Sequence, residues 1–107
     1  MSKFVEVASN AHVISGTGAL VNVAGTAVVL FNINGQIFAI DDVCMRCGWS
    51  LAAGKLHATL IRCSSCGWQY DVTTGCVMGV PALRIPTFEA KVADAAILVA
   101  TTAMQTF

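Results

Sequence analysis

Residues 44–68 read CMRCGWSLAAGKLHATLIRCSSCGW, and this stretch contains the same short motif twice. One C-x2-C pair is formed by Cys44 and Cys47, and fifteen residues further on Cys63 and Cys66 form a second pair. Each pair can chelate an ion from one tight turn, and the spacer allows the two turns to face each other. The spacing therefore predicts a single metal site with these four thiolates as ligands.

Two glycines favour a metal site. The alternative is four buried cysteines that bind no metal. Gly48 and Gly67 each follow a pair directly, where the chain must turn sharply and direct N–H groups at sulfur. Cys76 has no partner at this spacing and is left out of the site. Because four cysteines fill a tetrahedral shell, His12 and His57 are expected to be surface residues.

A closed shell of four thiolates argues against an enzyme, since hydrolytic zinc sites keep a position open for water. Electron transfer and structural support are the roles that remain. Three cations, Arg46, Lys55 and Arg62, lie near the cysteines in sequence; they either offset thiolate charge or are ordinary surface residues. Trp49 and Trp68 follow the glycines and are expected to shield the metal or pack beneath the loops.

The rest of the chain predicts an all-β fold. Residues 28–40, VVLFNINGQIFAI, contain two β-prone runs joined by Asn34-Gly35, the pair that a type I′ hairpin turn favours. Proline and glycine between residues 71 and 85 predict a loop. Further strands are expected at residues 3–8, 19–25, 83–92 and 95–101.

The bulk composition limits the possible partners. A chain of 107 residues fits one domain, 1–107, and six basic against six acidic residues give no sign of nucleic-acid binding. Its apolar stretches are too short to span a membrane, and residues 1–10 lack a secretory signal, so we expect a soluble cytoplasmic protein. With 56% hydrophobic and 11% charged residues, part of the surface is expected to be an interface, and an oligomer is possible.

Residues 27–99 resemble the Rieske-type ferredoxins and the Rieske domains of ring-hydroxylating dioxygenases. The resemblance rests on AIDDVC, GWSLAAGKL, IRCSSCGWQYDVTTG, GVPALRIPTFEAKV and AAILVA, which follow in that family's order and spacing. It implies a Rieske-like fold: a small antiparallel β-sandwich or barrel base with a two-loop metal-binding subdomain inserted at residues 43–83. Residues 79–82 resemble the family's covering loop over the site, or form a simple turn.

The ligand pattern departs from that family. Its first loop has C-x-H and its second C-x-x-H, which hold a [2Fe–2S] cluster through two cysteines and two histidines. By resemblance, Cys44 and Cys63 occupy the cysteine positions, Arg46 and Cys66 the histidine positions, and Cys47 lies one residue beyond. Thiols reach less far than imidazoles, which favours one tetrahedral iron ion over an all-cysteine [2Fe–2S] cluster; zinc is the alternative occupant.

The resemblance implies a small electron-transfer protein that carries electrons from a reductase to a terminal oxygenase. The low charge favours docking through shape and partly apolar surface. The alternative is a zinc-bound structural or protein-interaction module, or a non-redox Rieske-like subunit of a larger enzyme.

Overall fold

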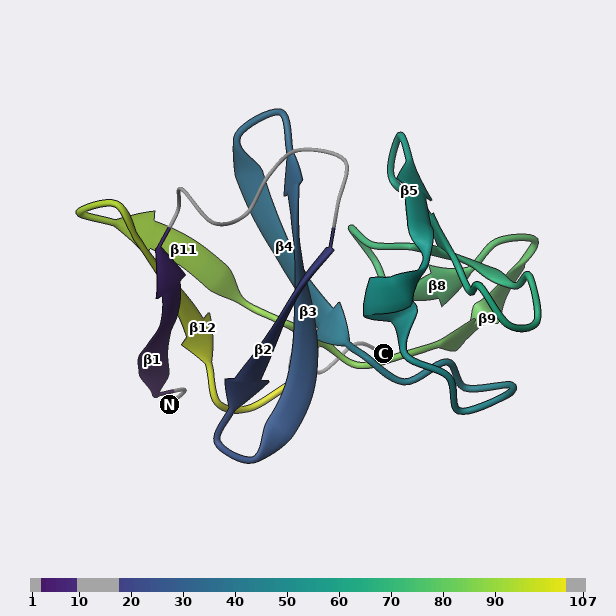
Figure 1. The fold of residues 1–107 in the computed structure, drawn as a ribbon, viewed down its shortest axis with the longest axis horizontal. Helices are drawn as coiled ribbons and strands as arrows, with labels where there is room; N and C mark the ends of the chain where they lie inside the picture. The colour runs from purple at the N-terminus through teal and green to yellow at the C-terminus, as the bar shows by residue number, and fades with distance from the viewer. Residues whose placement is uncertain (1–2, 10–17, 104–107) are drawn as a thin grey trace.

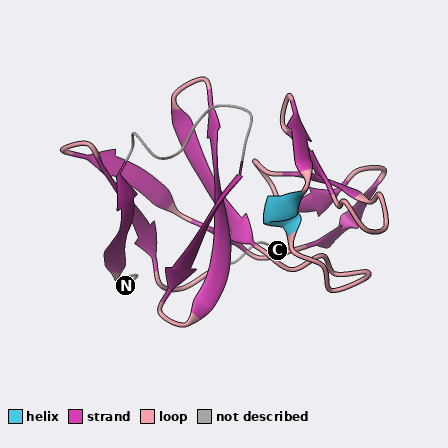
Figure 2. Cartoon of the chain, in the orientation of Figure 1, coloured by secondary structure: helices cyan, strands magenta, loops and turns pink. Residues whose placement is uncertain are grey.

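The computed structural model describes residues 3–9 and 18–103, which form three antiparallel sheets (Figures 1 and 2). The prediction of an all-β fold is confirmed. One short 3-10 turn, Leu51–Ala53 (η2), is the helical element of the described ranges. Within those ranges no helix has the length and apolar character needed to cross a membrane.

Two sheets form the base of the molecule (Figure 1). The first has three strands in the order β1-β12-β11, with bounds Phe4–Ser9, Ala96–Ala100 and Ala90–Ala93. The second has four strands in the order β10-β4-β3-β2, with bounds Thr87–Phe88, Gln36–Asp41, Thr26–Ile33 and Gly18–Val23.

The middle of strand β3, residues 28–31, is apolar and buried on both faces. Val28 and Leu30 belong to one core cluster together with Ile97 of β12. The alternate residues Val29 and Phe31 belong to a second cluster, which also contains Cys44, Cys63, Leu51, Ile61, Tyr70, Val72, Val77 and Ile85. Since side chains alternate across a strand, β3 joins the base core to the core beneath the cysteine loops.

The hairpin expected at residues 28–40 is present as β3 and β4. Asn34 and Gly35 have φ values of 53° and 88°, as a type I′ turn requires. The side-chain oxygen of Asn32 accepts a hydrogen bond of 2.9 Å from the Gly35 N–H, which closes the turn.

A third sheet carries the cysteine loops; we call it the loop sheet. Its five strands run in the order β5-β6-β7-β8-β9, with bounds Lys55–His57, Leu60–Arg62, Gln69–Asp71, Cys76–Val77 and Val80–Arg84. Residues 71–85 were predicted to be a loop, and this is wrong, because they contribute β8 and β9. Gly75 and Gly79, at φ 81° and 86°, lie at the turns that bound β8.

The prediction of a single strand at residues 83–92 is also wrong. This stretch divides into the end of β9, then β10, then β11, which belong to three different sheets. Pro86 lies at the first division and has no N–H to continue a ladder, while its carbonyl accepts a 2.9 Å hydrogen bond from the Asp41 N–H. The proline thus turns the chain from the loop sheet back to the base.

Candidate metal centre

The two cysteine pairs lie on loops of the same backbone design. In the first loop the Cys44 N–H donates to the Trp49 carbonyl at 2.9 Å, and the Gly48 N–H donates to the Cys44 carbonyl at 2.9 Å. The second loop repeats both bonds, from Cys63 to Trp68 at 2.8 Å and from Gly67 to Cys63 at 3.0 Å. Each loop turns at its glycine, with φ values of 78° and 84° where side chains are strained.

The loops bring four sulfur atoms together at one end of the molecule. The Sγ atoms of Cys44, Cys47, Cys63 and Cys66 all lie within 4.8 Å of one another. Across the loops, the Cys44 and Cys66 sulfurs are 3.7 Å apart and the Cys47 and Cys63 sulfurs 3.5 Å apart. A tetrahedral ion with metal–sulfur bonds of about 2.3 Å has ligand sulfurs about 3.8 Å apart. The four sulfurs therefore form a cage of the size that one ion requires.

Burial differs among the four cysteines. Cys44 and Cys63 are each 1% exposed and belong to the core beneath the loops, whereas Cys66 is half-buried and Cys47 is exposed. The site thus has a protein side, closed by the first two sulfurs, and a solvent side at Cys47. An ion held there would lie within a few ångströms of the surface.

Tyr70 of β7 supports the buried side of the cage. Its hydroxyl oxygen accepts a 3.0 Å hydrogen bond from the Met45 N–H and lies 3.1 Å from the Cys44 sulfur. Desolvation, followed by the bond to Cys44, raises the pKa of Tyr70, which keeps its O–H as a donor to the thiolate. Tyr70 was not among the residues predicted for the site. It is the one tyrosine of the chain and lies four residues after Cys66, where its sequence context indicates only an aromatic residue in a strand.

The loop environment separates the pKa values of two of the thiols. Burial alone would raise the pKa of Cys44, but the Tyr70 hydroxyl, the N–H groups of Cys47 and Arg46 and the Cys66 thiol together lower it to about 6. For Cys47 the Trp49 N–H lowers the pKa, but desolvation and the neighbouring cysteine sulfurs outweigh it and raise it to about 11. In the absence of metal, the Cys44 thiol therefore ionises at a lower pH than the Cys47 thiol.

This difference predicts a pH dependence of metal uptake. Below pH 11 the Cys47 thiol is protonated and must lose its proton to become a ligand, so the apparent zinc affinity should rise at least about tenfold per pH unit between pH 7 and 9. Below pH 6 Cys44 also gains a proton, and the dependence should steepen. Competition with a chromophoric chelator from pH 5.5 to 9 measures both slopes, and an affinity independent of pH would contradict the thiol assignment.

Tyr70→Phe tests the support of Cys44 from β7. The substitution removes one hydrogen bond to a thiolate, and residues of this kind typically contribute about 10- to 100-fold to metal affinity. We expect zinc affinity to fall about tenfold and the pKa of Cys44 in the metal-free protein to rise. The thiolate absorbance near 240 nm during a pH titration reports the second effect. Unchanged values of both would rule out the proposed role of Tyr70.

The remaining residues singled out by sequence have different places. The Arg46 guanidinium lies over the Trp68 ring, 5.4 Å from its centroid. Trp68 packs against the core beneath the loops, whereas Trp49 is 54% exposed and does not fill the core. His57 is exposed on β5, as expected, and the prediction for His12 falls outside the described residues. The half-buried Cys76, in β8, is not among the four clustered sulfurs.

The β8–β9 hairpin lies beside the second cysteine loop. Its residues Val77, Met78 and Val80 share a hollow with Gly67 and Trp68. Residues 80–82, which resemble part of the family's covering loop, are strand rather than loop, and Gly79 makes the turn before them. The hairpin therefore stands next to the site.

Together, the fold and the converging thiols define a small all-β protein with a candidate thiolate metal centre at one end. Residues 3–89 match the model of the Rieske [2Fe-2S] domain family, and the chain belongs to this family.

Relatives and solved structures agree with this membership. The chain is 32% identical over 79 residues to the biphenyl dioxygenase ferredoxin subunit of Pseudomonas sp. (strain KKS102), covering 73% of this chain and 72% of the relative. It is 24% identical over 98 residues to the ferredoxin component of the naphthalene 1,2-dioxygenase system of Pseudomonas putida, covering 91% and 94%. The ferredoxin of carbazole 1,9a-dioxygenase from Nocardioides aromaticivorans IC177 superposes with a TM-score of 0.87 at 26% identity, covering 94% and 99%.

The family's two-iron cluster with two histidine ligands does not fit these residues. In the described ranges the four clustered side chains are all cysteines, and His57, on β5, is not among them. In the family pairing, Cys44 and Cys63 would share one iron and Cys66 would bind the other. The 3.7 Å between the Cys44 and Cys66 sulfurs is instead the spacing of two ligands on the same ion.

Proposed function

We propose that this protein is a one-electron carrier that accepts electrons from a reductase and passes them to a terminal oxygenase. Iron held by Cys44, Cys47, Cys63 and Cys66 would supply a ferric/ferrous couple at the tip of the molecule. The proposal is supported by the membership of the Rieske family and by relatives named as ferredoxin components of dioxygenase systems. A solved structure with a TM-score of 0.87 is described as a complex of reduced oxygenase and oxidized ferredoxin.

The observation that carries the proposal is the half-open cage of four sulfurs. Cys44 and Cys63 hold the protein side rigidly in the core, and Cys47 faces solvent. A carrier needs both properties, a fixed ligand set that changes little on reduction and a short path from the metal to a docked partner. In this proposal, residues 43–83 form the metal-binding subdomain within the single domain 1–107.

The sulfur spacing favours a single iron ion over an all-cysteine [2Fe–2S] cluster. In a cluster, sulfurs bound to different irons are separated by the width of the two-iron core, whereas the pairs across these loops are 3.5 and 3.7 Å apart. The arrangement resembles a rubredoxin centre placed on a Rieske scaffold. Such a site requires reduced thiols. The cytoplasm keeps thiols reduced, so the site is consistent with a cytoplasmic protein.

The surface around the cage suits transient docking. Six of the exposed large apolar side chains belong to the metal-binding subdomain: Val43, Met45, Trp49, Met78, Val80 and Leu83. Exposed apolar patches commonly mark interaction sites. They would let a partner exclude water next to Cys47 without a large interface.

A zinc-bound structural or interaction module is the second candidate function, because the same cage fits zinc equally well. Zinc has no redox chemistry, so the cysteines would then only tie the loops together. This candidate includes a non-redox Rieske-like subunit of a larger enzyme.

The decisive test is the metal and acid-labile sulfide content of protein purified from its native host, together with an absorption spectrum. One iron per chain without sulfide is expected, with thiolate-to-iron bands in the visible range. Two irons with sulfide would replace the single ion by a cluster. A colourless protein with one zinc would refute electron transfer and leave the structural module.

A further inference from the structure

The charged residues are divided unevenly between the two ends of this neutral protein. Residues 43–84 contain four cations, Arg46, Lys55, Arg62 and Arg84, and one carboxylate, Asp71. The other five carboxylates and two lysines lie elsewhere in the chain. Residues 43–84 thus have a formal charge of +3, which the Asp42 carboxylate bonded to the Ala52 N–H and a tetrathiolate centre of charge −1 or −2 offset.

Two of these cations lie opposite each other on neighbouring strands beside the second cysteine loop. Lys55 on β5 and Arg62 on β6 are direct partners in the antiparallel register, so their side chains leave the sheet on the same face. Like charges in this arrangement destabilise a sheet. No carboxylate of the described residues forms an ion pair with either of them. Asp71 instead accepts bonds from the N–H and hydroxyl of Thr73.

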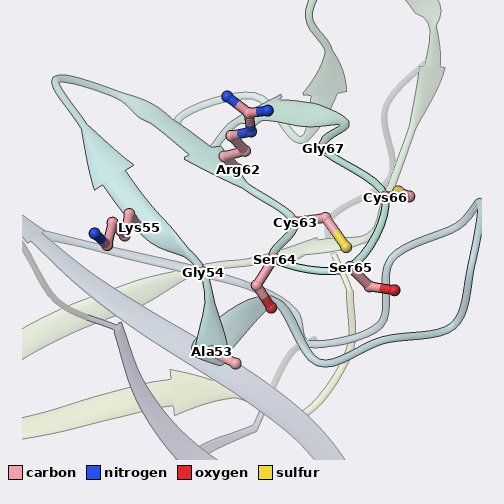
Figure 3. A pocket seen from close by; sticks show the side chains of 9 residues that line it. All are labelled: Ala53, Gly54, Lys55, Arg62, Cys63, Ser64, Ser65, Cys66 and Gly67. Carbon is pink, nitrogen blue, oxygen red and sulfur yellow. The ribbon is translucent and has the colours of Figure 1, made fainter.

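The two cations line a pocket of about 430 Å³ together with Cys63, Ser64, Ser65 and Cys66 (Figure 3). Arg62 also lies against the second loop, with a guanidinium nitrogen 3.4 Å from where a Cβ on Gly67 would stand. The lining of the pocket therefore combines two unpaired cations and two hydroxyls with two candidate metal ligands. Those are the groups that recognise carboxylates.

We propose that the Lys55–Arg62 pocket docks a carboxylate-rich surface of the redox partner. This proposal rests on the proposed function and specifies the chemistry of the partner's docking surface. A carboxylate placed between the two cations would relieve their repulsion and bring the partner's surface onto the loop of Cys63 and Cys66. The uneven distribution of charge between residues 43–84 and the base would also help to orient the carrier during approach, although its net charge is zero.

A protective role for Lys55 is the competing explanation. β5 is an edge strand, and lysine on an edge discourages pairing with other chains. That role does not account for Arg62, which lies on the inner strand β6. It also predicts that glutamate at position 55 would serve as well as lysine, because any charge protects an edge.

NMR titration of the zinc-loaded, 15N-labelled full chain with hexaglutamate tests the proposal without electron transfer. We expect shifts of the amides of residues 54–57 and 62–67 that disappear at about 0.2 M salt, where the Debye length is below 10 Å. Lys55→Glu/Arg62→Glu should weaken binding at least about tenfold. The control Lys3→Glu/Lys91→Glu makes the same change of net charge at the base and should bind like the parent.

Lys55→Glu alone keeps the test valid if the double variant folds poorly. It places a carboxylate opposite Arg62, so it should fold at least as well as the parent and still bind hexaglutamate several-fold more weakly. The proposal is overturned if hexaglutamate shifts no amides, shifts mainly those of the base, or binds the Lys55 and Arg62 variants like the parent. Because zinc is redox-silent, this result is independent of whether the native protein carries electrons.

Discussion

Replacing Cys63 with serine is expected to lower the affinity for zinc or ferrous ion by about 100-fold or more. Structural tetrathiolate sites bind zinc with about 10–16 kcal/mol, so each of four ligands contributes roughly 3 kcal/mol. Cys63 is 1% exposed and belongs to the core beneath the loops, so the variant also leaves a hydroxyl among apolar side chains. The loss of metal should therefore be accompanied by a lower melting temperature of the metal-loaded protein.

Cys76→Ser is the matched control for this experiment. Cys76 is half-buried in β8 of the same sheet but lies outside the group of four sulfurs. Its replacement should leave metal stoichiometry and affinity unchanged, as measured by elemental analysis and chelator competition. Equal metal binding by Cys63→Ser and the parent, or loss of metal from Cys76→Ser, would contradict the assigned ligand set.

The cluster of four cysteines was accessible to sequence analysis because its determinants are local. A C-x2-C pair followed by glycine specifies a tight turn by itself, and both pairs form the same turn here. The hairpin at residues 28–40 was accessible for the same reason, since Asn34-Gly35 encodes the two positive φ values. The continuous apolar run of β3 indicated a buried strand. It did not indicate that the two faces of this strand pack into different cores.

The loop sheet could not be predicted in the same way. Its strands β5 to β8 have two or three residues each, too few for an alternating pattern to appear. Their pairing depends on contacts such as Cys76 with Arg84, which span turns rich in glycine and proline. Proline and glycine were interpreted as loop signals, but Gly75 and Gly79 here bound a strand within the sheet.

The roles of Tyr70 and of the Lys55–Arg62 pair were missed because they depend on register. Tyr70 reaches Cys44 because β7 lies next to β6 in the loop sheet, with Tyr70 opposite Ile61. Lys55 and Arg62 are seven residues apart and become neighbours only through the β5–β6 pairing. Net charge likewise concealed the uneven distribution of charge along the chain, in which residues 43–84 have four cations and one carboxylate.

The largest expected change of function comes from restoring the family's ligands. The variant Arg46→His/Cys47→Ala/Cys66→His leaves Cys44 and Cys63 for one iron and supplies two imidazoles for the other. Because the scaffold superposes on a Rieske ferredoxin with a TM-score of 0.87, the longer imidazoles should have room to move the loops apart around two irons. We expect two irons and two acid-labile sulfides per chain after reconstitution, with the electron paramagnetic resonance signature of a Rieske centre.

The restored centre should also differ in its reduction potential. Neutral imidazoles in place of thiolates remove negative charge, and Rieske potentials lie on the order of several hundred millivolts above those of all-cysteine [2Fe–2S] ferredoxins. Histidine ligands would add a decrease of potential at alkaline pH, which the four-cysteine parent should lack. Arg46→His alone is the control and should retain one ion, since the four sulfurs remain. A triple variant that binds one iron without sulfide would show that the loops, rather than the ligand types, restrict this scaffold to a single ion.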